Sequence, residues 1–569
     1  MRFRVKSRNL TVHAVAGTHV VILGMNAPDE ARKGLLGFAI QRTDHTEGET
    51  YWLQGMRTFK VTNPNPPDGV YFSTAENPIQ DFLWSDFTAK TRHDYTYYVV
   101  GMRGTPKNYT LDAGTSVSIK VTTESDAAAS QSVYFNRGVI GSQAYTRQFG
   151  DNNPQKFVGS EKAKAYAWLS RGLEEAMLAF IQQADNPRYA LRAAVYEFGW
   201  DPVSAAFGDA LRACKDVRII YDARVPGGTK ELENKKRVTE AQNQFKKHKL
   251  TGKTAAGEDV TVPRTENPSY IAHNKFIVLL DGGDPVQVWT GSTNFTESGI
   301  FGQSNVGHVV RDRAVAAKYH AYWQALSGDP AQKEIVASDE LATPTLHKFP
   351  PPAGITPLFS PRADLAQLNW YATALENSTV LDCFTAAFGV NKVFFDVFTK
   401  PKKYLRYLFL EEWAVKKAAV VATQKALQKD PLVQVAVGAT MRDGAVAGWA
   451  KELFNPLSAH VHYTHNKFAL VDPLSDDPIV ISGSANFSDA STQHNDENML
   501  VVRGDTRVAD IYLGEFMRMW RHHRFREIVS KNSAKGGAVE HNYLTPDDSW
   551  TDPFYRAGTV KYVQRETFA

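Results

Sequence analysis

Two stretches decide the fold of this chain: IAHNKFIVLLDGGDPVQVWTGSTNF (Ile271–Phe295) and YTHNKFALVDPLSDDPIVISGSANF (Tyr463–Phe487). Each has His-Asn-Lys-Phe from its third residue, continues through two apolar runs separated by an acidic turn, and ends in Gly-Ser-x-Asn-Phe. The serine follows the histidine by 19 positions in both copies. Because packing requirements alone rarely produce such agreement twice, the repeat predicts two matching structural units.

Each copy has the pattern of a β-hairpin. The lysine lies two residues after the histidine and therefore shares its face of the strand, and the Gly-Ser-x-Asn segment returns a hydroxyl and an amide towards the same place. Positive charge and hydrogen-bond donors of this kind suit a phosphodiester anion. The two hairpins together predict one site from His273, Lys275, Ser292, Asn294, His465, Lys467, Ser484 and Asn486.

Helices and strands alternate on both sides of the first hairpin. A helix is predicted over Lys164–Gln183 and strands over Tyr189–Phe198 and Val217–Ala223, which is strand–helix–strand order. In the second half, apolar runs over Ser378–Val390 and Lys392–Phe398 precede a predicted helix over 404–429 and a strand over Leu432–Ala439. The two halves therefore repeat in broad order as well as in motif.

Residues 1–125 differ in texture, because short alternating runs such as Tyr95–Met102 are separated by turn signals. This pattern predicts an all-β sandwich, and it resembles fibronectin type III or immunoglobulin-like modules without the Cys–Trp–Cys signature. The predicted division is a sandwich domain over 1–125, a first lobe over 130–348, a Pro-rich linker over 349–357, a second lobe over 358–530 and a C-terminal packing extension over 531–569.

Composition is that of a folded globular protein, with 569 residues, 43% hydrophobic residues and 22% charged residues. The two cysteines, Cys214 and Cys383, exclude a disulfide framework or a cysteine zinc site, and we expect buried thiols. No apolar stretch of signal-peptide or membrane-spanning type is found, so the sequence predicts a cytoplasmic protein without a transmembrane segment. The net charge of +4 is compatible with anionic substrates.

The repeated motif resembles that of the phospholipase D superfamily, in which HxKxxxxD followed by GSxN occurs twice in a bilobed enzyme. The second copy fits completely through His465, Lys467, Asp472 and Ser484, and Glu497 resembles the acidic residue that orients the active-site histidine. The resemblance implies an α/β fold with two similar α/β/α lobes, preceded here by the sandwich. It also implies a catalytic set of His273, His465, Lys275, Lys467, Asp281, Asp472 and Glu497, with Ser292, Asn294, Ser484 and Asn486 binding substrate.

The first copy departs from the pattern in two places. Asp281 comes one residue late, and such a shift turns a strand side chain to the opposite face. Alignment through the serines places Asn305 where the second half has Glu497. The carboxylate for His273 is therefore absent or supplied from elsewhere, and we expect the two histidines to be inequivalent.

The resemblance further implies hydrolysis through a phosphohistidine intermediate, with no metal and no cofactor. Within the family the N-terminal histidine is more often the nucleophile, which would make His273 the attacking group and His465 the acid and base. Glu497 equally favours His465 as nucleophile if it orients that ring. A metal site built on the HxHxxH run of His460, His462 and His465 is the alternative, although Thr464 replaces the aspartate of the metallo-β-lactamase-like motif.

The motifs report phosphodiester chemistry and leave the substrate open. Phospholipid head groups are favoured, and the mixed aromatic and lysine segment Lys392–Trp413 suits peripheral contact with a membrane. Nucleic acid is the alternative substrate, because Lys230–Lys253 carries eight basic residues against three acidic ones. The third hypothesis is that the protein binds its ligand without catalysing a reaction. Two motifs in one chain also predict a complete site within a monomer.

Overall fold

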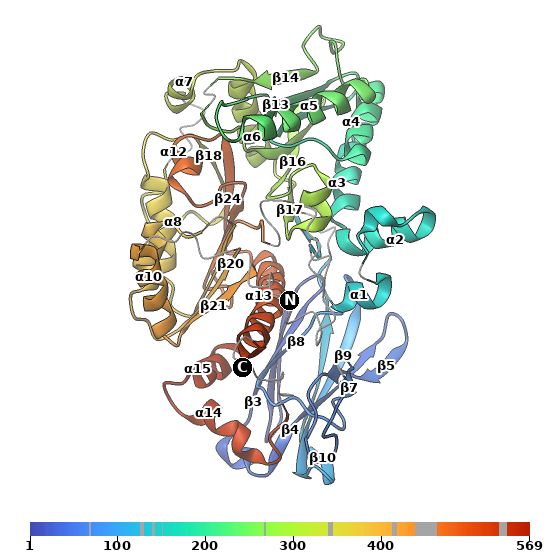
Figure 1. Ribbon diagram of the computed structural model, residues 1–569, viewed down its shortest axis with the longest axis vertical. Helices are drawn as coiled ribbons and strands as arrows, with labels where there is room; N and C mark the ends of the chain where they lie inside the picture. Colours follow the sequence, from blue (N-terminus) through green and yellow to red (C-terminus); the bar gives the residue numbers. More distant parts are fainter. Residues whose placement is uncertain are drawn as a thin grey trace.

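The computed structural model describes the chain except residues 68–69, 126–129, 139–142, 151, 267–268, 339–344, 388, 412–417, 439–463 and 534–542. Three parts are visible in Figure 1: a β-rich N-terminal part at the bottom and two α/β lobes above it. His460 and His462, which the metal alternative requires, lie outside the described residues.

The N-terminal part contains two four-stranded antiparallel sheets. One has the order β1 (Arg2–Lys6), β2 (Thr11–Ala16), β3 (Val21–Asn26), β8 (Leu83–Asp86), and the other β10 (Asn108–Thr122), β9 (Asp94–Thr105), β4 (Leu35–Asp44), β5 (Glu49–Trp52). Their alternating apolar residues, such as Leu23, Phe38 and Val99, share one buried core. The specific fibronectin type III identity stays a prediction.

The first lobe is built on a seven-stranded mixed sheet. Its order is β11 (Gln131–Phe135), β17 (Val306–Val310), β16 (Asp284–Gly291), β15 (Lys275–Asp281), β12 (Tyr189–Val195), β13 (Val217–Asp222), β14 (Thr261–Arg264). Successive side chains of β15 face opposite sides: Ile277 and Leu279 join the core under α3 (Leu173–Gln182) and α4 (Asp201–Cys214), whereas Phe276 and Val278 join the core under α6 (Arg313–Ser327).

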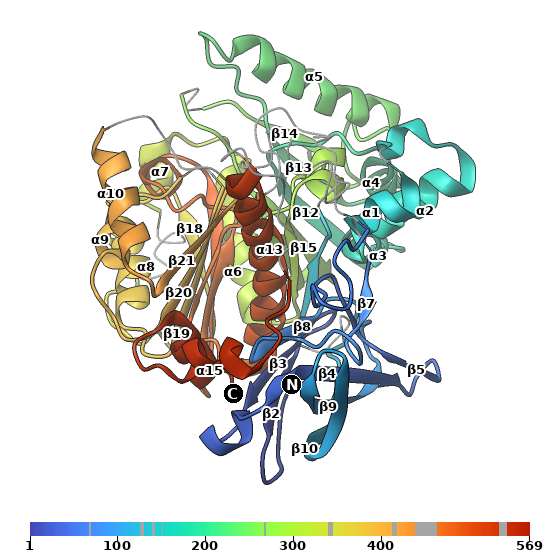
Figure 2. The ribbon, with the colours of Figure 1, turned by 60° about the horizontal axis from the view of Figure 1, so that its bottom comes forward.

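The second lobe repeats this sheet in the same order. Its strands are β18 (Gly354–Ser360), β24 (Glu497–Arg503), β23 (Ile479–Gly483), β22 (Phe468–Val471), β19 (Leu381–Ala386), β20 (Leu405–Leu410), β21 (Val433–Val437). Helices α8 (Ala366–Glu376) and α9 (Lys392–Phe398) cover one face. Helix α13 (Thr506–Ser533) lies with α6 in the middle of the molecule between the two sheets (Figure 2), where both share one core.

Two sequence expectations for the second half require correction. The predicted linker over 349–357 is too long, because residues 354–360 form strand β18 at the edge of the sheet. Pro357 is tolerated there since an edge strand needs no hydrogen-bond donors on its outer side. The predicted helix over 404–429 is also wrong at its start: Leu405–Leu410 form buried strand β20, and the helix is α10 (Ala418–Lys429). A fully apolar run of six residues does not distinguish a buried strand from a helix.

The described C-terminal residues return to the N-terminal sandwich. Trp550 and Phe554, around α14 (Asp552–Tyr555), lie in the sandwich core, and α15 (Val560–Phe568) packs on β3. At Gly24 a Cβ atom would lie 1.9 Å from the Phe568 carbonyl oxygen, so only glycine allows this approach. Both cysteines are free and buried, as predicted. Among the described residues, we find no helix with the length and apolarity needed to cross a bilayer.

Candidate active site

The two hairpin motifs meet at the ends of the two sheets. His273 precedes β15 and Ser292 follows β16, and their counterparts flank β22 and β23 in the second lobe. The histidines and lysines are almost fully enclosed, with His273 3% and His465 4% exposed. The structure therefore brings both predicted half-sites to one junction between the lobes.

Two short backbone bridges join the lobes at this junction. Ala272 pairs with Asp496, and Ser304 pairs with Thr464, both in parallel register. The amide of His273 donates to the Asp496 carbonyl at 2.9 Å, and the amide of His465 donates to the Ser304 carbonyl at 3.2 Å. His273 and Glu497 therefore directly follow the two residues of the first bridge. His465 and Asn305 directly follow those of the second.

This register determines the partner of each histidine. Nδ1 of His273 lies 2.9 Å from both carboxylate oxygens of Glu497, and Nδ1 of His465 lies 2.9 Å from Oδ1 of Asn305. The carboxylate for His273 is thus supplied by the second lobe. The alternative in which Glu497 orients His465 is wrong, because the bridges place Glu497 against the histidine of the opposite half.

The two motif serines hold these orienting residues. Oγ of Ser484 donates to Glu497 at 2.6 Å, and Oγ of Ser292 donates to Oδ1 of Asn305 at 2.8 Å. Since Oδ1 of Asn305 is an acceptor, the proton of neutral His465 lies on Nδ1. In this structure the serine hydroxyls, predicted to bind substrate, position the partners of the histidines.

The two motif lysines are arranged alike. Nζ of Lys275 donates to the carbonyl of His273, and Nζ of Lys467 to that of His465, both at 2.6 Å. Tyr196, which follows β12, packs against the first half: its ring centre lies 5.0 Å from the His273 ring and 5.2 Å from Nζ of Lys275. Two buried ammonium groups therefore flank the histidines.

The motif asparagines differ in their contacts. Nδ2 of Asn294 donates to Glu197 at 2.6 Å. Within the described part of the chain, the buried Oδ1 atoms of Asn294 and Asn486 have no hydrogen-bond partner. A buried polar atom without a partner is costly, so both amides suit contact with a bound substrate. Glu197 also lines a hollow of about 450 Å³ together with Tyr196, Arg237 and Glu240.

The two motif aspartates are not brought into this site. Asp281 ends β15 and pairs with Arg188, and at about 3.3 Å per strand residue it lies roughly 25 Å from His273. Asp472 accepts hydrogen bonds from the backbone amides of Thr379 and Val380 at the equivalent end of the second sheet. Both carboxylates therefore anchor the far ends of the strands that carry the histidines.

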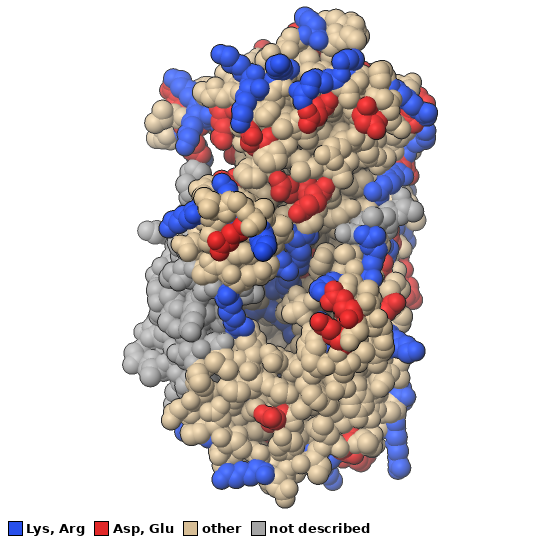
Figure 3. Space-filling view, turned by 90° about the vertical axis from the view of Figure 1, so that its right-hand side faces the viewer, with Lys and Arg blue, Asp and Glu red and all other residues tan. Residues whose placement is uncertain are grey.

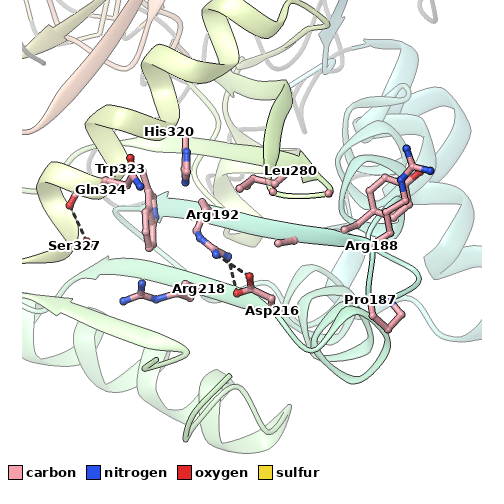
Figure 4. A pocket seen from close by; sticks show the side chains of 14 residues that line it. Pro187, Arg188, Arg192, Asp216, Arg218, Leu280, His320, Trp323, Gln324 and Ser327 are labelled. Carbon is pink, nitrogen blue, oxygen red and sulfur yellow. Dashed lines mark hydrogen bonds and ion pairs between the residues drawn. The ribbon is translucent and has the colours of Figure 1, made fainter. Parts of the chain in front are cut away.

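A separate pocket of about 610 Å³ lies at that far end of the first lobe (Figure 4). Arg192 and Asp216 lie side by side in its lining and form a two-point ion pair, with both bonds at 2.8 Å. Arg188, the partner of Asp281, is at its rim. The lining of this pocket includes none of the motif histidines, lysines, serines or asparagines.

Burial and like charge shift the ionisation of the site. Burial first, and then Lys275 and Lys467, lower the pKa of both histidines well below the usual range. Burial lowers the pKa of Lys275 to about 8 although Glu497 opposes the shift. Burial also raises the pKa of Glu497 to about 7. An added anion between the lysines would relieve this concentration of positive charge.

Sequence reasoning missed the supports behind these groups. The carboxylate of Asp496 holds Arg264 at 3.0 Å and Arg224 at 3.5 Å behind the bridge to Ala272. Glu411 accepts the amide of Thr464 at 2.8 Å behind the other bridge. A carboxylate at the end of a buried strand, as at Glu197 and Glu411, was the available signal. Among the described residues, no group of three metal-ligating side chains is found.

Ion pairs involve four of the eight basic residues of the stretch Lys230–Lys253. The stretch forms helix α5 (Glu231–Lys247), in which Lys235 pairs with Glu231 and Lys247 with Asp201, while Arg237 binds Asp222 behind the site. These pairs compensate part of the positive charge on which a nucleic-acid role would depend.

The family model for the cardiolipin synthase, PLD-like domain matches residues 177–327 and 415–520, and each segment contains one histidine motif. Both lobes of this chain are therefore similar to that family model. A curated relative, mitochondrial cardiolipin hydrolase of Mus musculus, is 40% identical over 58 residues, or 10% of this chain, and the match spans only about a quarter (24%) of that relative.

Two solved structures resemble the chain at low identity. Phosphatidylserine synthase of Haemophilus influenzae Rd KW20 is 13% identical, with a TM-score of 0.43, and the match covers 64% of this chain and 91% of that one. Yeast tyrosyl-DNA phosphodiesterase is 11% identical, with a TM-score of 0.31, and the match covers 56% of this chain and 85% of that one.

Proposed function

We propose that this protein is a phospholipase D-like phosphodiesterase that works without a metal ion, through a covalent bond between phosphorus and His273. One observation carries the proposal: each histidine is fixed at Nδ1 by a residue of the opposite lobe, so both rings present Nε2 to one junction. Lys275 and Lys467 supply the positive charge that a phosphodiester requires.

His273 is the better nucleophile because its partner is a carboxylate. As Nε2 attacks phosphorus, the ring gains positive charge, which Glu497 stabilises and the neutral amide of Asn305 does not. The phosphorus–nitrogen bond forms while the bond to the leaving oxygen breaks. His465 gives that oxygen its proton through Nε2.

The second step reverses these roles. Neutral His465 takes a proton from water, the water oxygen attacks phosphorus, and the phosphorus–nitrogen bond breaks with its electron pair returning to His273. In the free protein burial, and then the two lysines, keep the pKa of His465 low. A bound phosphodiester places negative charge between them, and we expect it to raise that pKa, so that His465 carries the proton for the first step.

We further propose a phospholipid as the substrate. Cardiolipin, a phospholipid, appears in the name of the matching family model and in that of the curated relative. The ion pairs along α5 weigh against the nucleic-acid alternative.

The test is cleavage of bis(p-nitrophenyl) phosphate in excess EDTA, with phospholipid vesicles and single-stranded DNA assayed in parallel. We expect metal-independent turnover of the chromogenic ester and of lipid. Replacement of His273 by Ala should reduce kcat at least 10³-fold, because it removes the nucleophile.

The matched control is Asp281→Asn, which changes the motif aspartate at the far end of β15 and should keep wild-type kcat. Loss of all activity in EDTA would overturn the metal-free mechanism. Cleavage of DNA alone would replace lipid by nucleic acid, and unchanged activity in His273→Ala would overturn the site itself.

A further inference from the structure

Three arginines gather where the N-terminal sandwich meets the first lobe. Arg137 follows β11, Arg171 follows α2 (Gly159–Ser170), and Arg518 lies on α13. His19, in the turn between β2 and β3, contributes to the same electrostatic cluster. Figure 3 shows Lys and Arg side chains in a hollow between the upper and lower parts of the molecule.

The charges of this cluster do not balance. Arg171 and Arg518 share one carboxylate, that of Glu515, with Nε of Arg518 at 2.8 Å. Within the described part of the chain Arg137 has no carboxylate in ion-pair contact, and its Nη1 donates to the Trp168 carbonyl at 2.6 Å. His19 adds no compensation, because burial lowers its pKa to about 3 and leaves it neutral. Three positive groups therefore face one negative group.

This excess charge is held away from water. The side chains of Arg171 and Arg518 are 6% and 14% exposed. Burial, and then the other two guanidinium groups, lower the pKa of Arg137 to about 9. Unpaired buried charge destabilises a fold, and a bound anion relieves it. Guanidinium groups bind phosphate with two hydrogen bonds each, and Trp168, 4.2 Å below Arg137, holds that group in place.

The cluster adjoins the His465 half of the catalytic site. Nη2 of Arg518 donates to the carbonyl of Asn136, and Oδ1 of Asn136 accepts the amide of Asn305, the partner of His465. Beyond Arg137 the chain passes so close to Ser304 that a Cβ at Gly138 would lie 2.5 Å from its amide nitrogen. The arginines are therefore built onto the segment that positions the acid and base.

We propose that Arg137, supported by Arg171 and Arg518, binds a second phosphate group carried by the substrate whose phosphodiester is cleaved between His273 and His465. This inference rests on the proposed function and narrows it to phospholipids with more than one phosphate. The excess of guanidinium groups matches one phosphate monoanion or dianion, and the hydrogen bonds through Asn136 connect the cluster to Asn305 beside His465.

The test compares kcat/KM for cardiolipin, which has two phosphates, and phosphatidylglycerol, which has one, in identical detergent micelles. For wild type we expect kcat/KM to be at least tenfold higher for cardiolipin than for phosphatidylglycerol. In Arg137→Gln this ratio should fall about tenfold, because KM for cardiolipin rises. The ratio for Arg137→Lys should lie between those of wild type and Arg137→Gln. The matched control is Arg212→Gln, which removes an exposed arginine of α4 paired with Asp209 and should keep the wild-type ratio.

Thermal melting separates binding from misfolding. Inorganic phosphate should raise the Tm of wild type above that in chloride at equal ionic strength, and should raise that of Arg137→Gln less. If Arg137→Gln melts cooperatively and has the same ratio of kcat/KM for the two lipids as wild type, the inference is overturned. Turnover of bis(p-nitrophenyl) phosphate without turnover of either lipid would also overturn it, while the proposed chemistry would stand.

Discussion

At the residue scale, the two halves of the site differ in one group: Glu497 faces His273, whereas Asn305 faces His465. The sequence could predict that the histidines are inequivalent, because Asn305 replaces a carboxylate in the first half. It could not predict which histidine gains Glu497, since partners from two lobes are chosen by tertiary contact and not by spacing. The motif aspartates lie far from the site for a different reason, because the length of an extended strand separates each of them from its histidine.

Glu497 should raise kcat but lower the free energy of unfolding when it is ionised. Burial raises its pKa from 4.5 to about 7, so its contribution to folding is fully present below pH 4.5 and is lost as the pH rises through 7. The neutral variant Glu497→Gln should therefore be more stable than wild type at pH 8, by about 3 kcal/mol at most. Its kcat should fall at least 100-fold.

Thermal unfolding of both proteins from pH 4 to pH 9 measures this difference. The gap should open between pH 4.5 and 8. A gap that is constant over the whole range would show that Glu497 does not titrate in this window. Activity of wild type should likewise fall below about pH 7, as Glu497 gains a proton and no longer accepts Nδ1–H of His273.

At the element scale, two bridges of one residue pair each set the register between the lobes. Periodicity predicted the hairpins that carry the motifs, because alternating apolar residues identify strands. It could not predict the bridges, which involve residues outside any strand, nor strand β20, whose six buried residues show no alternation. The bridges matter most for function because they place each histidine against its partner.

Asp496 should support both stability and register. Its carboxylate lies between the buried Arg264 and Arg224. Replacement by Asn leaves excess charge in a buried network, and we expect a loss of about 3 kcal/mol in the free energy of unfolding. Because the bridge to Ala272 is weakened, kcat should fall at least tenfold even under conditions where the variant is folded.

Urea unfolding and kcat on bis(p-nitrophenyl) phosphate measure the two effects. The control is again Asp281→Asn, whose partner Arg188 is exposed, so neither quantity should change much. If Asp496→Asn lost stability but kept full kcat, the bridge would be a structural contact without a role in positioning His273.

At the scale of the whole molecule, the two ends of the chain meet in the sandwich. Trp550 stacks on Phe82 with ring centres 5.5 Å apart, and its Nε1 donates to the Leu35 carbonyl at 2.7 Å. The strand pattern predicted an all-β N-terminal part. The contribution of Trp550 could not be predicted, because the C-terminal segment has spaced aromatics and no regular period.

Trp550→Ala should therefore destabilise the sandwich. Removal of a large buried aromatic costs about 3–5 kcal/mol. Since the catalytic junction lies between the lobes, kcat at low temperature should stay near that of wild type. Calorimetry and kcat at 15 °C provide the comparison. A parallel loss of kcat at 15 °C would indicate that the sandwich acts directly on the site.

In the proposed mechanism Glu497 makes His273 the nucleophile, and a covalent adduct on His273 can be detected directly. The direct measurement is mass spectrometry of acid-sensitive, base-stable adducts after rapid mixing with bis(p-nitrophenyl) phosphate, using His465→Ala and His273→Ala in parallel. Because p-nitrophenolate leaves without a general acid, His465→Ala should release one equivalent and retain a p-nitrophenyl phosphoryl group on the peptide that contains His273. An adduct on His465 in the His273→Ala variant, with none on His273 in the other, would contradict the account.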